Sequence, residues 1–546
     1  MDHDTAINLI KDTFNHPFNE EKFSNFSISL LHDVKRSDVT NWQNNSNLPS
    51  EIKNQIIEYK IFGKLNYENG EKIVVAIAKL KSSKIVEKSR LTQRNFAKYV
   101  LEITEADACL VSFFAENYED WRFSFVNLKY DREISEQGKI KIKKLISNFK
   151  RFSYLVGKNE PNNTAKLQIV PLLLNKKVSS IEEIERAFSV EKVTDNFFND
   201  YKNLFLDLSQ EIDALRRKDK KIGKDFKENE IDTENFSKKT LGQIVFLFFL
   251  QKKGWLGIER NLNNNFKNWG SGSKNFISEL FQKYEDKKIE ANNFYNDILE
   301  PIFYDALNNP EDFYEKLDCK MPFLNGGLFE PINGYNWYET NILIKDATIK
   351  KILNIFNQYN FTITEDQPLD REVAVDPEML GKVFEKLLNE KERKKGGAHY
   401  TPREVVQYMC KKSLFYFLQK NVDNEINQNE FDILLSLSEN PDNENLENLK
   451  VTKLFKKLSK ISDSLENIKI CDPAIGSGAF PVSMMILISN IISLIGNILK
   501  TEKDIYDIKR NFIESNLYGV DVDSGAVDIA KLRLWLSLVI DEKSFE

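Results

Sequence analysis

The chain is 546 residues long, with 41% hydrophobic and 29% charged residues and a formal net charge of −6. This length predicts roughly three domains of ~150 residues each, and the composition is ordinary for a soluble globular protein. The negative charge argues against a cationic coat for nucleic acid over the whole molecule, although it allows a local basic groove.

The cysteines are scattered along the chain, which indicates neither disulfides nor a zinc site. Reduced thiols, together with the lack of a signal-peptide pattern at the amino end, predict a cytoplasmic protein. The cysteines are Cys109, Cys319, Cys410 and Cys471.

Residues 1–160 are predicted to form an α/β domain. Residues 1–60 show no clear periodicity. A helix is predicted over residues 91–103, because its apolar residues recur at helical spacing. Apolar runs rich in β-branched and aromatic residues indicate strands. The expected strands cover residues 73–80, 108–114 and 122–128.

Two basic segments are found, one near the end of this domain and one after it. Each is interpreted as a solvated face or as a contact for DNA phosphates, because a run of charged residues does not distinguish between these two roles. The first contains Lys139, Lys141, Lys143, Lys144, Lys150 and Arg151, and the second runs from Arg216 to Lys221.

Residues 161–390 are predicted to form a helical connector, because the periodicity there is mostly helical. The residues of a glycine-containing turn at 322–330 reveal no function by themselves. The expected helices cover residues 197–218, 239–253, 292–307, 344–356 and 377–388.

A third domain is predicted over residues 391–546, and it opens with a turn around Thr401 and Pro402. Thr401 is expected to cap the following helix, and Pro402 suits its first position. This arrangement would hold backbone amides and a hydroxyl toward a crevice. Residues 420–466 are acidic and rich in asparagine, which predicts an exposed, partly flexible insertion.

The most informative stretch lies at residues 468–480, where an apolar run ends in Asp472 and Pro473. Gly476 and Gly478 then flank a serine, and a long apolar helix pattern begins. The order predicts a strand, a tight turn and a helix N-terminus, where backbone passes close to a polar ligand. The glycines would allow positive φ and a close approach.

The apolar helix pattern at residues 481–499 could be mistaken for a membrane span. A helix buried against a parallel sheet has the same apolar pattern, and this is the preferred interpretation.

A second short strand is predicted at residues 516–523, with Asp523 expected to cap the helix pattern at 526–538. In an open parallel sheet, the acid that ends the second strand can accept hydrogen bonds from both ribose hydroxyls. Asp472 and Asp521 are 49 positions apart (521 minus 472), against ~20 in a dinucleotide fold. NAD is therefore not the natural ligand.

Three segments of this domain resemble the S-adenosylmethionine-binding motifs of DNA adenine methyltransferases that methylate the amino group, in gamma-class order. The helix at 529–538 extends the likeness to fused restriction-modification enzymes of type IIG and related phage-defence methyltransferases. Segments at 187–194, 242–257 and 322–330 are similar to that family's connecting region, so the resemblance begins at about residue 70. The three motifs are Thr401-Pro402, Asp472-Pro473-Ala474-x-Gly476-Ser477-Gly478-x-Phe480 and Gly519-Val520-Asp521-Val522-Asp523.

The resemblance implies the first half of a Rossmann-like class I methyltransferase sheet, with S-adenosyl-L-methionine as cofactor. It implies that Asp472 faces the amino group or the sulfonium, Asp521 the ribose hydroxyls and Val522 the adenine. Thr401 and Pro402 would contact the methionine carboxylate. The remaining implied cofactor-binding residues are Pro473, Ala474, Gly476, Gly478 and Phe480.

The family also suggests a PD-(D/E)XK nuclease-like domain at the amino end, where Gln93 resembles that fold's supporting glutamine. Its chemistry needs an acid, and then an acid-x-lysine on a strand, to hold divalent metal and activate water. Ile77 stands two places before Lys79, which predicts a degenerate nuclease without a metal or cutting site. Nearby acids are explained equally well as solvated loop positions. They are Asp107, Glu116 and Asp120.

Methylation of an adenine amino group requires the base to be turned out of double-stranded DNA. The family usually holds it with an Asn-Pro-Pro-Tyr loop, which this sequence lacks, so no catalytic residue is named. The chain is expected to be the amino-terminal part of such an enzyme, with a second chain as a candidate to supply the catalytic loop and the target-recognition domain, and not to methylate DNA alone. A non-catalytic DNA-binding or assembly subunit and a metal-dependent nuclease stay open as alternatives.

Overall fold

The computed structural model forms two compact units, each with a hydrophobic core of its own. Unit 1 contains Met1–Phe197, Asn357–Asn360 and Asp366–Val375. Unit 2 contains Phe198–Phe356, Phe361–Glu365 and Asp376–Glu546. The structure describes residues 1–32, 41–127, 131–134, 140–143, 150–324, 327–363, 365, 369–387, 401–439, 443–501 and 503–541.

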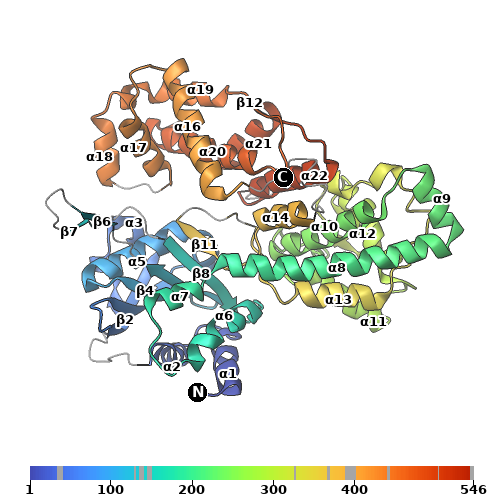
Figure 1. Cartoon of the computed structure of the whole chain (residues 1–546), viewed down its shortest axis with the longest axis horizontal. Helices are drawn as coiled ribbons and strands as arrows, with labels where there is room; N and C mark the ends of the chain where they lie inside the picture. The colour runs from blue at the N-terminus through green and yellow to red at the C-terminus, as the bar shows by residue number, and fades with distance from the viewer. Residues whose placement is uncertain are drawn as a thin grey trace. The chain divides into compact units, whose positions relative to one another are not determined.

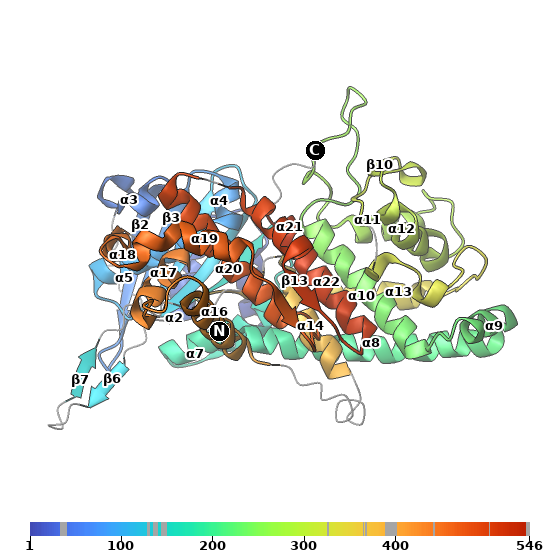
Figure 2. The same cartoon turned by 90° about the horizontal axis from the view of Figure 1, so that it is seen from above.

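Unit 1 is built on a mixed seven-stranded sheet in the order β1-β2-β3-β4-β5-β8-β11 (Figure 1). The pairs β3–β4 and β8–β11 are parallel, and the other neighbours are antiparallel. β6 (Asp131–Ile134) and β7 (Ile140–Lys143) form a separate antiparallel pair (Figure 2). The sheet strands are β1 (Gln43–Asn44), β2 (Ile56–Asn66), β3 (Lys72–Leu80), β4 (Ala108–Ala115), β5 (Asp120–Asn127), β8 (Lys150–Gly157) and β11 (Asp370–Glu372).

Helix α5 (Arg90–Thr104) connects the parallel strands β3 and β4, as a crossover between parallel strands requires. The strands and helix predicted between residues 73 and 127 are therefore confirmed, and Leu128 lies outside the described residues. The other helices of unit 1 are α1 (His3–Phe14), α2 (Glu20–Leu31), α3 (Ser50–Lys53), α4 (Ser83–Lys88), α6 (Asn163–Leu174) and α7 (Ile181–Arg186).

The amino-terminal helices α1 and α2 were not expected from the sequence. Phe14 and Phe23 from these helices, and Phe18 between them, pack around Trp121 with ring centroids 5.5, 5.8 and 5.3 Å away. The sequence pattern is weak because serine and threonine side chains also lie on the buried faces of both helices.

A buried network of charges joins β11 to the rest of unit 1. Arg151 on β8 is fully buried, and its Nε and Nη2 donate to the two oxygens of Asp370, each at 3.0 Å. Arg122 and Arg90 contact Glu372 Oε2 at 3.2 and 2.6 Å. The expectation that Arg151 belongs to a solvated or phosphate-facing patch is wrong, because a buried guanidinium needs a carboxylate. Lys139 and Lys144, with the side chains of Lys141 and Lys143, lie outside the described residues.

The acids near β3 are held by protein partners. Lys79 Nζ lies 3.4 Å from Glu58 Oε1 and 3.2 Å from Glu116 Oε2. Asp120 is fully buried and accepts hydrogen bonds from the backbone amide and Nδ2 of Asn159, at 3.0 and 3.2 Å. The interpretation of Asp120 as a solvated loop residue is therefore wrong, because its carboxylate organises the turn after β8.

The connector region is mostly helical. A five-residue π-helical turn, Tyr295–Leu299, precedes α12 (Glu300–Tyr304) in the stretch expected to be one helix. β9 (Phe313–Tyr314) and β10 (Cys319–Lys320) form a short antiparallel pair. The other helices are α8 (Val190–Lys218), α9 (Lys220–Glu228), α10 (Thr233–Lys252), α11 (Phe276–Glu285), α13 (Asp346–Phe356) and α14 (Pro377–Leu387).

In the remainder of unit 2, α16, α17, α19 and α21 pack around α20 (Figure 1). By length and composition alone α20 could cross a membrane, with a mean hydropathy of 2.0, but here it supplies the middle of a core. The elements are α16 (Arg403–Asn421), α17 (Gln428–Glu439), α18 (Asn443–Lys450), α19 (Leu458–Glu466), β12 (Ile470–Asp472), α20 (Ala479–Leu499), α21 (Ile505–Ser515), β13 (Leu517–Gly519) and α22 (Ser524–Val539).

The expectation of an exposed, partly flexible insertion at residues 420–466 is wrong for its described part. Phe431, Leu434, Leu449 and Ile461 are fully buried in the same core as α20. The acidic and asparagine-rich composition concealed these apolar positions, because each short helix buries only one narrow stripe.

Candidate functional site

Two parallel strands form the frame of the candidate site. β12 pairs with β13 in the register Ile470–Leu517, Cys471–Tyr518 and Asp472–Gly519, which confirms the predicted parallel pair. The carboxyl ends of both strands therefore lie at one edge, the edge at which open α/β sheets bind ligands. The Val520 amide continues the pairing by donating to the Asp472 carbonyl at 3.1 Å.

The turn after β12 has the backbone conformation that its glycines predict. Gly476 and Gly478 have φ values of 51° and 82°, in the left-handed region that favours glycine. A side chain at Gly478 would place its Cβ 2.9 Å from the Cβ of Ala530 on α22. The lack of a side chain at Gly478 thus lets the turn approach α22 closely.

Asp521 joins the end of β13 to the glycine turn. Its Oδ2 accepts a hydrogen bond from the Gly476 amide at 2.8 Å, and its Oδ1 accepts one from the Asp523 amide at 3.0 Å. Asp523 in turn caps α22, accepting from the Gly525 amide at 2.9 Å, so the predicted cap is confirmed. The structure therefore brings the first acidic strand end, the glycine turn and the second acid together.

One carboxylate oxygen of Asp472 accepts a hydrogen bond, and the other accepts none from the described residues. Oδ1 accepts a hydrogen bond from the Ala474 amide at 3.1 Å. Oδ2 is shielded from solvent and accepts no hydrogen bond within the described part of the chain. Such an atom is costly to keep, because a shielded acceptor without a donor loses its interaction with water. The neighbouring Pro473 and Ala474 are exposed.

Thr401 and Pro402 lie directly before helix α16. Pro402 is the N-cap, and no side-chain hydrogen bond caps the helix, so the expected Thr401 cap is wrong. The reason is the extended ψ of 141° at Pro402, which delays the first helical residue to Arg403. The Arg403 guanidinium pairs with Asp376, at 3.1 Å, and with Glu378 on α14.

The middle of α16 lies beside the start of α20. The Cys410 thiol is 3.9 Å from the Phe480 carbonyl. Burial, and then the negative charge of nearby Asp472, raises the pKa of Cys410 to about 12. The Phe480 ring packs against the core around α20, whereas Val522 is 98% exposed.

Sequence reasoning missed two residues that contact the turn from other elements, and a third that orients one of them. Glu385 on α14 accepts a hydrogen bond from the Ser477 hydroxyl at 3.1 Å. Arg533 on α22 donates to the Ser477 carbonyl at 2.8 Å and forms a bidentate pair with Glu365. The available signal was the single charge of Arg533 on an otherwise apolar face of α22, which predicts a buried partner. Glu385 shares its face of α14 with the charged Glu378 and gave no such signal.

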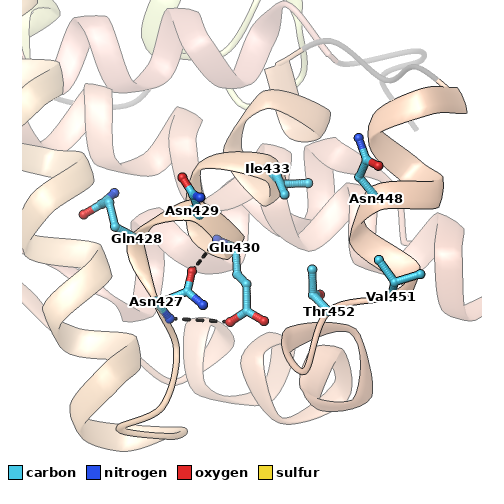
Figure 3. Close-up of a pocket in the computed structure, with 8 residues that line it drawn as sticks. All are labelled: Asn427, Gln428, Asn429, Glu430, Ile433, Asn448, Val451 and Thr452. Atoms are coloured by element: carbon cyan, nitrogen blue, oxygen red, sulfur yellow. Dashed lines mark hydrogen bonds between the residues drawn. The ribbon is translucent and has the colours of Figure 1, made fainter.

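A separate hollow of about 640 Å³ lies in the helical layer beside α17 (Figure 3). Glu430 accepts hydrogen bonds there from the amides of Lys453 and Asn427 at 3.0 and 3.5 Å, and Asn427 Oδ1 caps the Glu430 amide at 2.9 Å. These polar groups stabilise the start of α17, which accounts for them without a ligand. The hollow is lined by Asn427, Gln428, Asn429, Glu430, Ile433, Asn448, Val451 and Thr452.

Comparison with known proteins identifies the class of this region. Residues 446–545 match the family profile described as MmeI, DNA-methyltransferase domain. The stretch from α18 to the end of α22 is therefore similar to the DNA-methyltransferase domain of MmeI.

A relative with a more particular name supports that class. A Methanocaldococcus jannaschii protein, named as a proposed type II restriction enzyme and methyltransferase, is 33% identical over 387 residues. The match covers 64% of this chain and 30% of that protein, so the chain spans about a third of its relative's length.

Two solved structures have weaker similarity. The type IIL restriction-modification enzyme MmeI in complex with DNA is 18% identical, with a TM-score of 0.34, over 55% of this chain and 33% of that one. The DrdV–DNA complex is 11% identical, with a TM-score of 0.26, over 96% and 36%. Similarity at these TM-scores establishes neither fold nor function.

Proposed function

We propose that unit 2 binds S-adenosyl-L-methionine as part of a DNA methyltransferase in a restriction-modification or phage-defence system. The observation that carries the proposal is the shielded Asp472 Oδ2 at the carboxyl end of a parallel strand, which accepts no hydrogen bond from the residues that the structure describes. Such an oxygen fits a ligand that brings positive charge, because charge-assisted hydrogen bonds offset the loss of water. The cofactor has an ammonium and a sulfonium, and it supplies the methyl group when bound.

The other proposed cofactor contacts follow from positions around this oxygen. Asp521 uses one lone pair of each oxygen for backbone amides, so further lone pairs can accept from ribose hydroxyls. Val522 offers an exposed apolar side chain to the adenine. We propose that Thr401 and Pro402 contact the methionine carboxylate. Pro473, Ala474, Gly476, Gly478 and Phe480 complete the proposed site through the shape of the turn.

The acceptor and the partners are proposed on the family likeness. We propose that the acceptor is adenine N6 in double-stranded DNA, and that a second chain or segment supplies the catalytic loop and the recognition of sequence. The relative's name and the profile match support DNA methylation in restriction-modification, and the choice of adenine and the second chain or segment rest on the motif resemblance. The expected place of action is the cytoplasm.

For the amino-terminal module we propose a degenerate nuclease-like fold. The parallel strands β3 and β4 joined by α5 support it, and so does the buried Gln93, whose Oε1 accepts from Arg151 at 2.7 Å. Ile77 occupies the position where the motif would require an acid, so the module is proposed to contact DNA or to pack rather than cut.

Asp472→Asn tests the cofactor site. The change keeps an acceptor for the Ala474 amide but removes the charge, so S-adenosylmethionine should bind about 10- to 100-fold more weakly, as when a charged hydrogen bond is lost. Titration calorimetry with S-adenosylmethionine and S-adenosylhomocysteine separates the two cations. An equal loss for both ligands indicates the ammonium, and a loss for S-adenosylmethionine alone indicates the sulfonium.

The matched control is Asp463→Asn, which removes an exposed carboxylate from α19. It should leave both dissociation constants unchanged. Unaltered affinity in Asp472→Asn, or no binding by the wild-type chain, would contradict the proposal.

A further inference from the structure

The glycine turn is supported from outside its own strand and helix. Ser477, between Gly476 and Gly478, is only 3% exposed, so its side chain faces the protein. Its hydroxyl donates to Glu385 Oε1 at 3.1 Å. The same oxygen is 3.5 Å from where a Gly476 side chain would begin. One carboxylate of α14 therefore lies against two successive residues of the turn.

Helix α14 approaches the turn closely because it has a glycine at the point of contact. A Cβ at Gly381 would lie 2.6 Å from the Ser477 hydroxyl oxygen and 2.8 Å from its Cβ. A glycine within a helix costs about 1 kcal/mol relative to alanine. The glycine allows α14 to pack closely on Ser477, which offsets that cost.

Ser477 is held on its backbone side as well. Arg533 Nη1 donates to the Ser477 carbonyl at 2.8 Å. Arg533 is oriented by Glu365, whose two oxygens lie 2.6 and 3.0 Å from its Nε and Nη2. The Ser477 hydroxyl, side chain and carbonyl are thus each in contact with a residue far away in the sequence.

Glu385 is kept in an environment that does not favour its charge. Burial raises the pKa of Glu385, hydrogen bonds from Ser477 and the charge of Arg533 oppose that rise, and the nearby charge of Asp521 adds to it. Its Oε2 is shielded and accepts no hydrogen bond within the described residues. A carboxylate that serves only packing would be replaceable by an apolar side chain at less cost.

We propose that Glu385 is a positioning residue of the methyl-donor site, acting through Ser477 to hold the glycine turn in its binding conformation. The inference rests on the proposed function of unit 2. It assigns α14 of the connector, beside α22 in Figure 2, to the machinery of the cofactor site. The turn then has its binding conformation only while α14 is packed against it.

The test combines S-adenosylmethionine titration with hydrogen exchange of peptides covering residues 472–482 in the full chain. Glu385→Ala should weaken binding about 10- to 100-fold, as expected for one hydrogen bond to a charged group. Exchange in those peptides should become faster, and Glu385→Gln, which keeps an acceptor, should restore most of both. Because Glu385 acts through Ser477, Glu385→Ala should have little further effect in a Ser477→Ala background.

Gly381→Ala provides an independent variant. It improves the helix propensity of α14 but collides with Ser477, so α14 should keep its protection while binding weakens and exchange of the turn rises. Lys386→Ala, an exposed position on the same helix, is the control and should change neither readout. If Glu385→Ala unfolds the chain, Glu385→Gln and Gly381→Ala still test the inference.

The inference is overturned if Glu385→Ala and Gly381→Ala leave both the affinity and the exchange of the turn unchanged. If the wild-type chain binds no S-adenosylmethionine while Glu385→Ala still loosens the turn, the proposed function fails and the positioning role remains.

Discussion

Shielded carboxylate oxygens that accept no hydrogen bond from the described residues mark positions where this chain departs from ordinary packing. Asp472 Oδ2 and Glu385 Oε2 are such oxygens beside the glycine turn; we propose a cationic ligand for Asp472, and Ser477 donates to the other oxygen of Glu385. Glu300 has another in the connector, where its Oε1 accepts from the Tyr335 hydroxyl at 2.9 Å. Glu300 is fully buried, so its ionised form would be unfavourable.

Glu300 should make stability depend on pH. Burial raises the pKa of Glu300 well above its ordinary range, against an opposing hydrogen bond from Tyr335. The folded chain therefore keeps a proton that the unfolded chain loses above its ordinary pKa of about 4.3, and stability falls as pH rises toward the folded pKa.

Glu300→Gln removes that dependence. The variant should gain stability relative to wild type by up to about 1.4 kcal/mol per pH unit within this window. Urea unfolding between pH 5 and 8 measures the gain, and the exposed Glu290→Gln serves as the control. A difference between variant and wild type that does not change with pH would show that Glu300 titrates normally.

At the scale of elements, β11 shows how a three-residue strand is kept at the edge of a sheet. It pairs in parallel with β8, and Asp370 and Glu372 each neutralise buried arginines of unit 1. The strand is too short to be held by its backbone pairing alone, so the ion pairs determine whether it stays in place.

Asp370→Ala should therefore destabilise the chain strongly. Removing one partner leaves the buried Arg151 guanidinium without its carboxylate, which costs about 3–5 kcal/mol. Denaturant unfolding measures the loss, and Glu182→Ala, at an exposed ion pair of α7, should change stability by less than about 0.5 kcal/mol. A loss below about 1 kcal/mol for Asp370→Ala would show that Arg151 finds another partner or reaches water.

At the scale of the whole molecule, each of the two units contains a hydrophobic cluster of its own among the described residues. Unit 1 is centred on its sheet and α5, with Phe96 fully buried, and the core around α20 in unit 2 includes the fully buried Ile488. The chain crosses from unit 1 to unit 2 within α8 and returns to unit 1 for two short segments. The residues of one compact unit therefore do not form a single continuous stretch of the sequence.

A substitution in the core of one unit should loosen mainly that unit. Phe96→Ala should cost about 3–5 kcal/mol and speed hydrogen exchange in unit 1 peptides, including β11, although β11 lies more than two hundred residues away along the chain. Ile488→Ala should cost about 2–5 kcal/mol and speed exchange in the helices around α20. Exchange spreading equally over both units in either variant would contradict the division.

The sequence predicted those parts of the fold and the site in which neighbouring residues act together. The strand ending at Asp472, the positive φ of Gly476 and Gly478, and the cap at Asp523 all follow from residues within a few positions of one another. The cap at Thr401 and the exposure of residues 420–466 were predicted wrongly, because extended backbone at a proline and narrow buried stripes leave little trace in composition.

By itself, the sequence determined that this chain contains two short strands with acidic ends around a glycine turn. It also determined the motif likeness that suggests a methyl donor. Tertiary structure alone decided that Asp521 binds the Gly476 amide, that Glu385 and Arg533 hold Ser477, and that β11 belongs to unit 1. The physical reason is that a buried charge or a shielded oxygen is satisfied by whichever partner folding brings near, and local patterns carry no record of that partner.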